Sequence, residues 1–416
     1  MGRIIAWVGI AMLSVYLVFF GGGWFGLYVA ELRLASVILA GLAVLVWVIV
    51  AWRSAAWRPR SHLLPAIAVA LGSMALSTAT SRYPRQSIEY LGYAIVLAAL
   101  YLLLVRLLAH PFFRARMGPF TVGMAIVLGI AYAVANLVHW VAWWGIVGRF
   151  TLPPLRPESE SLTFGNPSTV LTIVLLFSIS SFAVIGLSGR SSRIVLGLIT
   201  LLAAFATFAS GSRAGWLAIG ITGLVMFVLL ATSADRQRQA RTVAVQWSAT
   251  IRSRVVLGIV GLGAIGAFIK LAPTLTRRLT EGGADLRFNY LLAAERMFAE
   301  APLVGTGPGT WVIQRVHYTF APETDYYIPH AHNIYVQTFA ELGLVGVAAG
   351  IVLVASLVLL VRDAIRDEDP TRRRWGWAAA VAMTYVAAHQ ILDFYANMPS
   401  ILYAAAIPIA WLDATA

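Results

Sequence analysis

Apolar runs of about 17 to 25 residues recur from one end of the chain to the other, and they constrain its fold more than any other feature. Each run has the length that an α-helix needs to cross a hydrocarbon core of about 30 Å. Hydrophobic residues make up 60% of the chain and charged residues only 12%, so few positions interrupt these runs. Lipid admits only helices or closed barrels, and the runs are continuous rather than alternating. The sequence therefore predicts an all-α polytopic integral membrane protein.

Hydropathy predicts about twelve transmembrane helices, at 4–20, 34–52, 63–79, 87–105, 119–146, 168–187, 194–209, 214–232, 255–272, 333–361, 375–391 and 398–412. We interpret the first as a retained span and not as a cleaved signal peptide, because many further spans follow it. The chain then divides into helices 1–9 in residues 1–272, one large loop at 273–332, and helices 10–12 in residues 333–416.

The charge distribution predicts the orientation in the membrane. A net charge of +13 would suggest nucleic acid in a soluble protein, but here arginine clusters at 53–60, 106–116, 236–254 and 362–374 all fall on the side of the N-terminus. Charges on the opposite side cancel. By the positive-inside rule both termini are cytoplasmic and the large loop lies outside the cytoplasm. The absence of cysteine excludes disulfides and thiolate chemistry.

Polar residues gather where the large loop turns into the tenth span, between His330 and Gly346. A helix that begins near His332 carries Asn333, Gln337 and Glu341 on one face, over about 12 Å of its length. Uncompensated polar groups at this depth cost several kcal/mol each, so the stripe is expected to face the protein interior or a wet cavity.

Two elements are predicted within the large loop. Apolar residues at helical spacing indicate a helix from Asp285 to Glu300 that lies over or beside the membrane. The glycines and prolines of 301–311 then stop any helix. Its Gly-Thr-Gly-Pro-Gly segment is a turn and not a nucleotide-binding loop, since no lysine follows it and no strand precedes it.

Two arginines on the non-cytoplasmic side are candidates for phosphate binding. Arg213 follows a very short connection, and Ser212 before it is a plausible N-cap, so free N–H groups, the helix dipole and a guanidinium would meet there. The alternative is a snorkelling arginine. Arg287 is the second candidate, and its alternative is a surface ion pair with Asp285, Glu281 or Glu295.

His332 is the candidate general base, because imidazole can accept a proton from a sugar hydroxyl near neutral pH. The alternative is a loop histidine that is hydrogen-bonded at a helix start. A metal site is a further alternative, built from His330, His332, His317, Glu323 and Asp325. No HExxH helix or close acidic pair accompanies these residues, and two arginines can neutralise a diphosphate, so no metal and no cofactor are expected.

Asp393 follows the eleventh span at the same level as His332. It is expected to orient an acceptor or to balance an arginine, and the alternative is a carboxylate that water solvates at a helix end.

These residues resemble a known family. His332-Asn333, nine residues, then Gly343-Leu344-Val345-Gly346 is similar to the HN-x9-GxxG signature of bacterial O-antigen ligases, within the O-antigen ligase and polymerase superfamily. Further segments resemble the same family, at Gly165-Asn166-Pro167, 210–215, Arg287-Phe288 and 302–305. One departure is Ser168, where relatives often have asparagine.

The resemblance implies a metal-independent, inverting glycosyltransferase of the GT-C type in the bacterial inner membrane, with a periplasmic active site. It implies transfer of O-antigen from undecaprenyl diphosphate to lipid A-core. His332 would be the base, and Arg213 and Arg287 would bind the donor diphosphate. From their positions beside His332, Asn333 and Asp393 are expected to complete the substrate site. The partners would be these two substrates and membrane lipid, with no nucleic acid.

Two alternatives remain open. A polymerase or a protein O-oligosaccharyltransferase would share the arginine segments, although the His-Asn pair and the lack of a large C-terminal extension favour the ligase. A transporter that binds an anionic solute is the other, but the sequence has no clear inverted symmetry.

Overall fold

The computed structural model describes residues 30–149, 213–231, 284–318, 330–396 and 399–416, and scattered positions between 194 and 209. Within these residues every regular element is a helix and none is a strand. The helices are α2 (Ala30–Arg53), η1 (Ala55–Trp57), α3 (Leu64–Ala79), α4 (Pro84–Leu108), α5 (Pro111–Val147), α8 (Arg213–Ala231), α11 (Ala284–Glu300), α12 (Trp311–Gln314), η2 (Arg315–Tyr318), α13 (Ile334–Arg366), α14 (Pro370–His389) and α15 (Pro399–Asp413).

A helix occupies each predicted span at 34–146, 214–232 and 333–412. The predicted spans at 4–20, 168–187 and 255–272 lie outside the described residues, and so does most of 194–209. Several helices are longer than the apolar run that predicted them, since α5 begins eight residues before the run at 119 and α14 begins five residues before 375. Hydropathy detects only the apolar part of a helix, whereas a proline at the first helical position sets where α5 and α14 begin.

Length and apolar character make α4 and α13 candidates for membrane-spanning helices. Large apolar side chains also cover the outer faces of several helices, among them Leu42, Val138 and Ile351, each at least half exposed. Water would penalise such surfaces, while lipid tails solvate them at no cost. The exposed apolar faces of the helices therefore support the prediction of a membrane protein.

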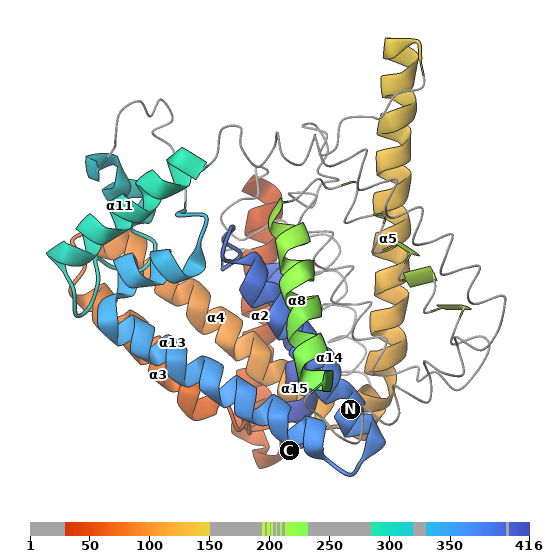
Figure 1. The fold of residues 1–416 in the computed structure, drawn as a ribbon. Coiled ribbons are helices and arrows are strands. Elements are labelled where there is room, and N and C mark those ends of the chain that lie inside the picture. Colours follow the sequence, from red (N-terminus) through yellow and green to blue (C-terminus); the bar gives the residue numbers. More distant parts are fainter. Residues whose placement is uncertain are drawn as a thin grey trace.

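The helices form one bundle, and α11 lies over the end at which α13 begins (Figure 1). Within the bundle α13 packs against α3 and α14, and α14 also packs against α8 and α15. The main core lies around α15, between α4 and α14, with Trp375 and Trp411 stacked at 5.1 Å between ring centroids. A smaller core joins α11 to the start of α13 through Tyr290 and Trp311. It holds the loop helix in a fixed place on the bundle.

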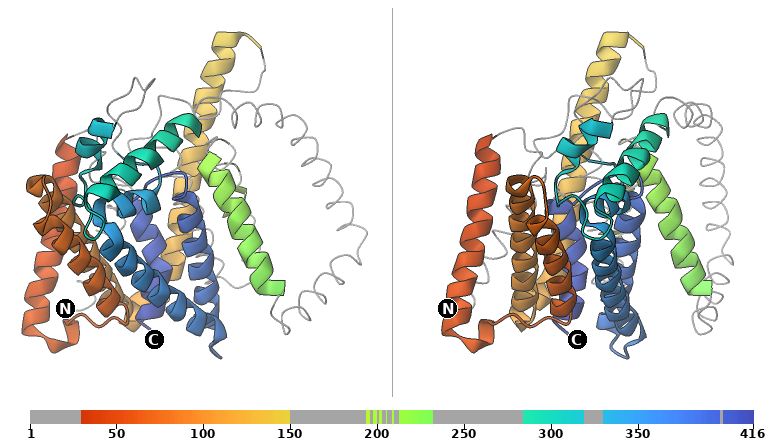
Figure 2. Two further views of the ribbon diagram at one scale, coloured as in Figure 1. Left: turned by 60° about the vertical axis from the view of Figure 1, so that its left-hand side comes forward. Right: turned by 90° about the vertical axis from the view of Figure 1, so that its left-hand side faces the viewer.

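The connections divide between the two ends of the bundle. The α2–α3 connection, which carries Arg58 and Arg60, and the α13–α14 connection lie at one end, and α11 lies at the other (Figure 2). Arginines occupy the ends of α13 and α14 that flank the second connection, at 362, 366 and 372–374. Asp369 caps α14 by accepting hydrogen bonds from the N–H groups of Thr371 and Arg372. Arg372 in turn pairs with Asp367 at 2.8 Å, so this turn is tight.

Candidate functional site

Asn333 begins α13 and ties it to the segment that follows α14. Its Oδ1 accepts hydrogen bonds from the N–H groups of Tyr335 and Val336 at 2.9 and 3.0 Å, which caps the helix. Its Nδ2 donates to the carbonyl of Ile391 at 3.0 Å. The N–H of Ile334 donates to the carbonyl of Gln390 at 3.2 Å. Two backbone segments, the start of α13 and the stretch that follows α14, are thereby held together.

His332 is the one non-glycine residue with positive φ in the part of the chain that the structure describes, at φ 51°. A left-handed backbone costs an L-residue about 1–2 kcal/mol and persists where surrounding contacts enforce it. The ring of His332 stacks on Tyr290, with 6.1 Å between centroids and 23° between planes. Its Nδ1 lies 3.7 Å from Oδ1 of Asp393. The side chain is still 37% exposed, so a substrate can reach it.

Asp393 lies against His332 and is mostly buried, with 19% of its side chain exposed. Burial alone would raise its pKa, but contact with His332, a hydrogen bond from the N–H of Phe394 and the nearby charge of His389 lower the pKa to about 2. The carboxylate is therefore ionised at neutral pH. It faces a histidine and not an arginine or open solvent, and its expected role in orienting an acceptor stays a prediction.

Arg287 reaches the same place from α11. Its Nη2 donates to the carbonyl of Leu392 at 3.3 Å, next to Asp393 in the chain. Tyr290, one helical turn further along α11, is the residue under the ring of His332. The structure thus brings together four of the five predicted site residues, from three distant parts of the sequence: Arg287, His332, Asn333 and Asp393.

Arg213 is the first residue of α8, but its side chain lies outside what the structure describes. Ser212, predicted to cap this helix, also lies outside the described residues. The phosphate-binding role of Arg213 stays a prediction.

His330 lies beside His332, with 4.3 Å between ring centroids, and stacks on Phe394. Burial lowers its pKa to about 4, and the charge of His332 acts in the same direction. No group of three His, Asp or Glu residues within the described ranges is arranged to hold a metal ion. Glu323 and Asp325, two of the proposed metal ligands, lie outside those ranges.

The polar stripe of α13 faces the interior, as predicted, with Gln337 2% and Glu341 6% exposed. The two carboxyl oxygens of Glu341 accept hydrogen bonds from the N–H groups of Gly309 and Trp311, at 3.0 and 2.8 Å. The side-chain NH₂ of Gln337 donates to Glu341 at 3.2 Å, and its side-chain oxygen accepts a hydrogen bond from the N–H of Ala331 at 3.0 Å. The stripe therefore links the glycine-rich turn to the residue immediately before His332.

Two glycines allow the turn to lie close against α13. Gly305 has φ +72°, and a Cβ there would overlap the backbone of Glu341. Gly343 has φ +60° inside α13, where it interrupts the helix and lets the next two N–H groups donate to the carbonyls of Pro302 and Leu303. The first glycine of the GxxG pattern is thus required by backbone geometry.

Tyr290 is the site residue that sequence reasoning did not single out as functional. It lies in the segment whose apolar residues at helical spacing predicted the loop helix, and it follows Arg287 by three positions. That spacing puts both residues on one face of α11, and it was the sequence signal from which Tyr290 could have been predicted to lie at the site.

Residues 198–351 match the model of a family described as O-antigen ligase. The matched range includes Arg213, Arg287, His332 and Asn333, whereas Asp393 lies beyond it. No curated protein matches the chain.

Proposed function

Because the match over residues 198–351 supports the assignment of this chain to the O-antigen ligase family, we propose that it transfers O-antigen from undecaprenyl diphosphate to a sugar hydroxyl of lipid A-core. One observation carries the proposal. His332 is held between Tyr290 and an ionised Asp393, beside Arg287, at the start of a long apolar helix. A base, a cation and a membrane boundary meet there, as a reaction between two lipid-borne sugars requires.

The base in this proposal is Nε2 of His332. Asp393 faces Nδ1, which favours the tautomer with the proton on Nδ1 and leaves Nε2 free to accept one. The acceptor hydroxyl gives its proton to Nε2, and its oxygen bonds to the anomeric carbon. The bond from that carbon to the diphosphate oxygen breaks, and its electron pair leaves with the diphosphate. A positioned base of this kind contributes about 100- to 10,000-fold in rate.

The arginines stabilise the leaving diphosphate. Guanidinium groups bind phosphate oxygens through parallel, charge-assisted hydrogen bonds, and charge that develops on a leaving group is stabilised where donors are already in place. Arg287 supplies one such group at the site. Arg213 supplies the second in the proposal, from the start of α8.

A single displacement inverts the anomeric centre and needs no metal ion in this scheme, because the two arginines take the role of the cation. We further propose twelve spans with cytoplasmic termini and an inner-membrane location. The site would then face the periplasm, where both lipid-linked substrates would be present. The α2–α3 connection and the adjoining ends of α13 and α14 carry arginines, and they lie at the end of the bundle opposite α11, which supports this orientation (Figure 2).

The test is a transfer assay with purified protein in detergent and EDTA. The donor is an undecaprenyl diphosphate-linked oligosaccharide, and separate tubes contain lipid A-core, an acceptor peptide or excess donor. We expect product on lipid A-core alone, loss of that product with His332→Ala, and weaker donor binding with Arg213→Ala. Lengthened donor would instead indicate a polymerase, and a glycosylated peptide a protein O-oligosaccharyltransferase. Loss of transfer in EDTA that added Mg²⁺ restores would contradict the metal-free scheme.

A further inference from the structure

An apolar cavity of about 680 Å³, open on one side, lies among α2, α3 and α4 and reaches to the α2–α3 connection at Pro59. Its walls are formed entirely by apolar residues, among them Trp47, Trp52, Ile67, Leu71, Ile95 and Leu102. Figure 2 shows α2 on the flank of the bundle, with α3 and α4 next to it. Such a cavity suits a hydrocarbon chain and gives a polar solute nothing to bind.

Four arginines surround the end of this cavity. Arg53 ends α2, Arg58 and Arg60 lie in the connection to α3, and Arg106 lies one turn beyond Leu102 of the cavity wall. None of their guanidinium groups has an ion pair or a hydrogen bond to another residue that the structure describes. Arg60 and Arg106 are close enough for their charges to repel each other. No guanidinium of the cluster is therefore paired with a carboxylate of the described residues.

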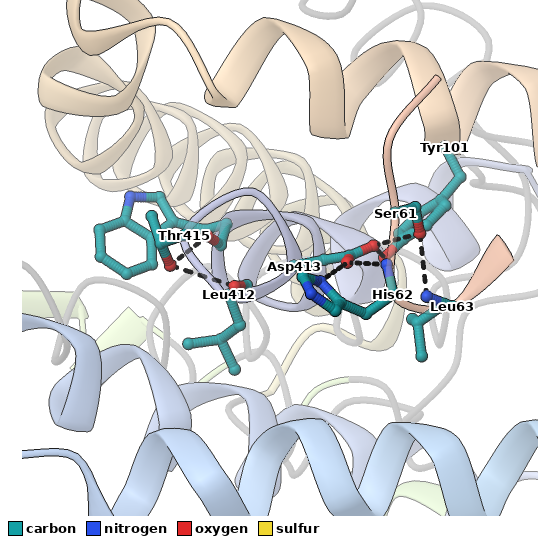
Figure 3. A network of polar contacts seen from close by, with 8 residues as sticks. Ser61, His62, Leu63, Tyr101, Leu412, Asp413 and Thr415 are labelled. Carbon is teal, nitrogen blue, oxygen red and sulfur yellow. Dashed lines mark hydrogen bonds and ion pairs between the residues drawn. The ribbon is translucent and has the colours of Figure 1, made fainter. Parts of the chain in front are cut away.

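Asp413 lies next to this cluster, but its carboxylate is fully buried and bonds to other groups (Figure 3). It accepts hydrogen bonds from the hydroxyl groups of Ser61 and Tyr101 and from the backbone N–H of His62, at 2.7 Å for the last. Its oxygens thus hold the start of α3 in place and make no bond to a guanidinium of the described residues.

The segment that carries Arg58 and Arg60 is fixed at both ends. The indole N–H of Trp47 donates to the carbonyl of Trp57 at 3.0 Å, which holds the segment to α2. At its other end Ser61 and His62 bond to Asp413. The backbone that presents the two guanidinium groups is therefore held at the cavity end, which lowers the entropy cost of binding an anion there.

We propose that this cavity binds an anionic glycerophospholipid, with an acyl chain among α2, α3 and α4 and the phosphate headgroup at Arg58, Arg60 and Arg106. The occupant must combine a hydrocarbon chain with an anion, because the cavity is apolar and the cluster beside it is cationic. A second copy of the chain would bring its own arginines to the same place and repel. In the proposed orientation the lipid comes from the cytoplasmic leaflet, and the inference does not depend on the transfer reaction.

Native mass spectrometry of the full-length protein tests the headgroup part. The protein is released from detergent with equal amounts of phosphatidylglycerol and phosphatidylcholine that have identical acyl chains. We expect a preference for phosphatidylglycerol, and a loss of about fivefold for each arginine removed in Arg58→Gln, Arg60→Gln and Arg106→Gln. The control combines Arg362→Gln, Arg366→Gln and Arg374→Gln on α13 and α14, which changes the net charge equally.

An equal loss in the control, or equal binding of the two lipids by the native protein, would overturn the proposal, because the effect would then be non-specific. The acyl part is tested with Ala98→Phe, which narrows the cavity, against Ile351→Phe on an exposed face of α13. Only Ala98→Phe should reduce phosphatidylglycerol retention. Complete displacement of the lipid by millimolar inorganic phosphate would show that the acyl chain contributes nothing, and would also overturn the proposal.

Discussion

Glu341→Leu should destabilise the contact between the glycine-rich turn and α13 more than any change at the exposed surface. The substitution leaves the N–H groups of Gly309 and Trp311 buried without an acceptor, since both now donate to the carboxyl oxygens. A buried donor without a partner costs about 1–3 kcal/mol, so the two together cost about 2–6 kcal/mol. Loss of the hydrogen bond from the Gln337 amide adds less to this cost, because a side chain can turn toward another acceptor.

Glu341→Gln should lower the stability by about half as much as Glu341→Leu. Its amide oxygen still accepts one of the two backbone hydrogen bonds, while its NH₂ group faces the other donor. Glu300→Gln is the matched control, because the same chemical change there affects only an exposed pair with Arg82, at 3.3 Å. Exposed ion pairs of this kind contribute about 0–1 kcal/mol.

Thermal unfolding in detergent measures the stability of these variants, and transfer per folded molecule measures the site. We expect the unfolding temperature to fall in the order Glu300→Gln, Glu341→Gln, Glu341→Leu, from the smallest effect to the largest. Transfer should fall with it, because Gln337 connects Glu341 to the backbone before His332. If Glu341→Leu unfolds at the same temperature as the Glu300→Gln control, the buried hydrogen bonds of Glu341 do not stabilise the contact between the turn and α13, and the prediction is wrong.

Three further predictions concern the residues around this stripe. Asp393→Asn should reduce transfer by about 100-fold or more with little change in donor binding, because the amide no longer favours the productive tautomer; single-turnover rates and a donor-binding titration separate the two effects. Burial lowers the pKa of His330 from about 6.5 to about 4, so the unfolded chain takes up a proton at a higher pH than the folded chain, and the stability should fall as the pH drops from about 6.5 to 4. His330→Phe keeps the stack on Phe394 and removes this titration. The unfolding temperature of that variant should therefore change less over this pH range. Gly343→Ala should cost about 1–3 kcal/mol or more through its positive φ and overlap with the backbone of Leu303, whereas Gly350→Ala, with open space around it, should be neutral or stabilising in the same unfolding assay.

Local features of the sequence were sufficient to predict several elements. The helix expected from Asp285 to Glu300 is α11, the glycine- and proline-rich segment after it is a turn, and the polar stripe of α13 is buried. Each of these follows from periodicity or from the conformational limits of glycine and proline, which are properties of neighbouring residues.

Partnerships between distant residues did not follow from the sequence. Asp393 was expected to orient an acceptor, to balance an arginine or to be solvated by water, and its contact with His332 was not foreseen. Tyr290 had no predicted role beyond packing, and it stacks on the same ring. Neither pairing has a signal in spacing, because 61 positions separate His332 from Asp393 and 42 separate it from Tyr290.

The sequence by itself determined that this protein is helical and suited to a membrane, because hydrophobic length and helical period are read from consecutive residues. It also determined which polar residues interrupt the apolar runs. Only the tertiary structure decided which of them meet. The packing of α11 over the start of α13, and the hydrogen bond from Asn333 to Ile391, bring three separate segments to one point. Such contacts depend on how whole helices pack, and no stretch of neighbouring residues encodes them.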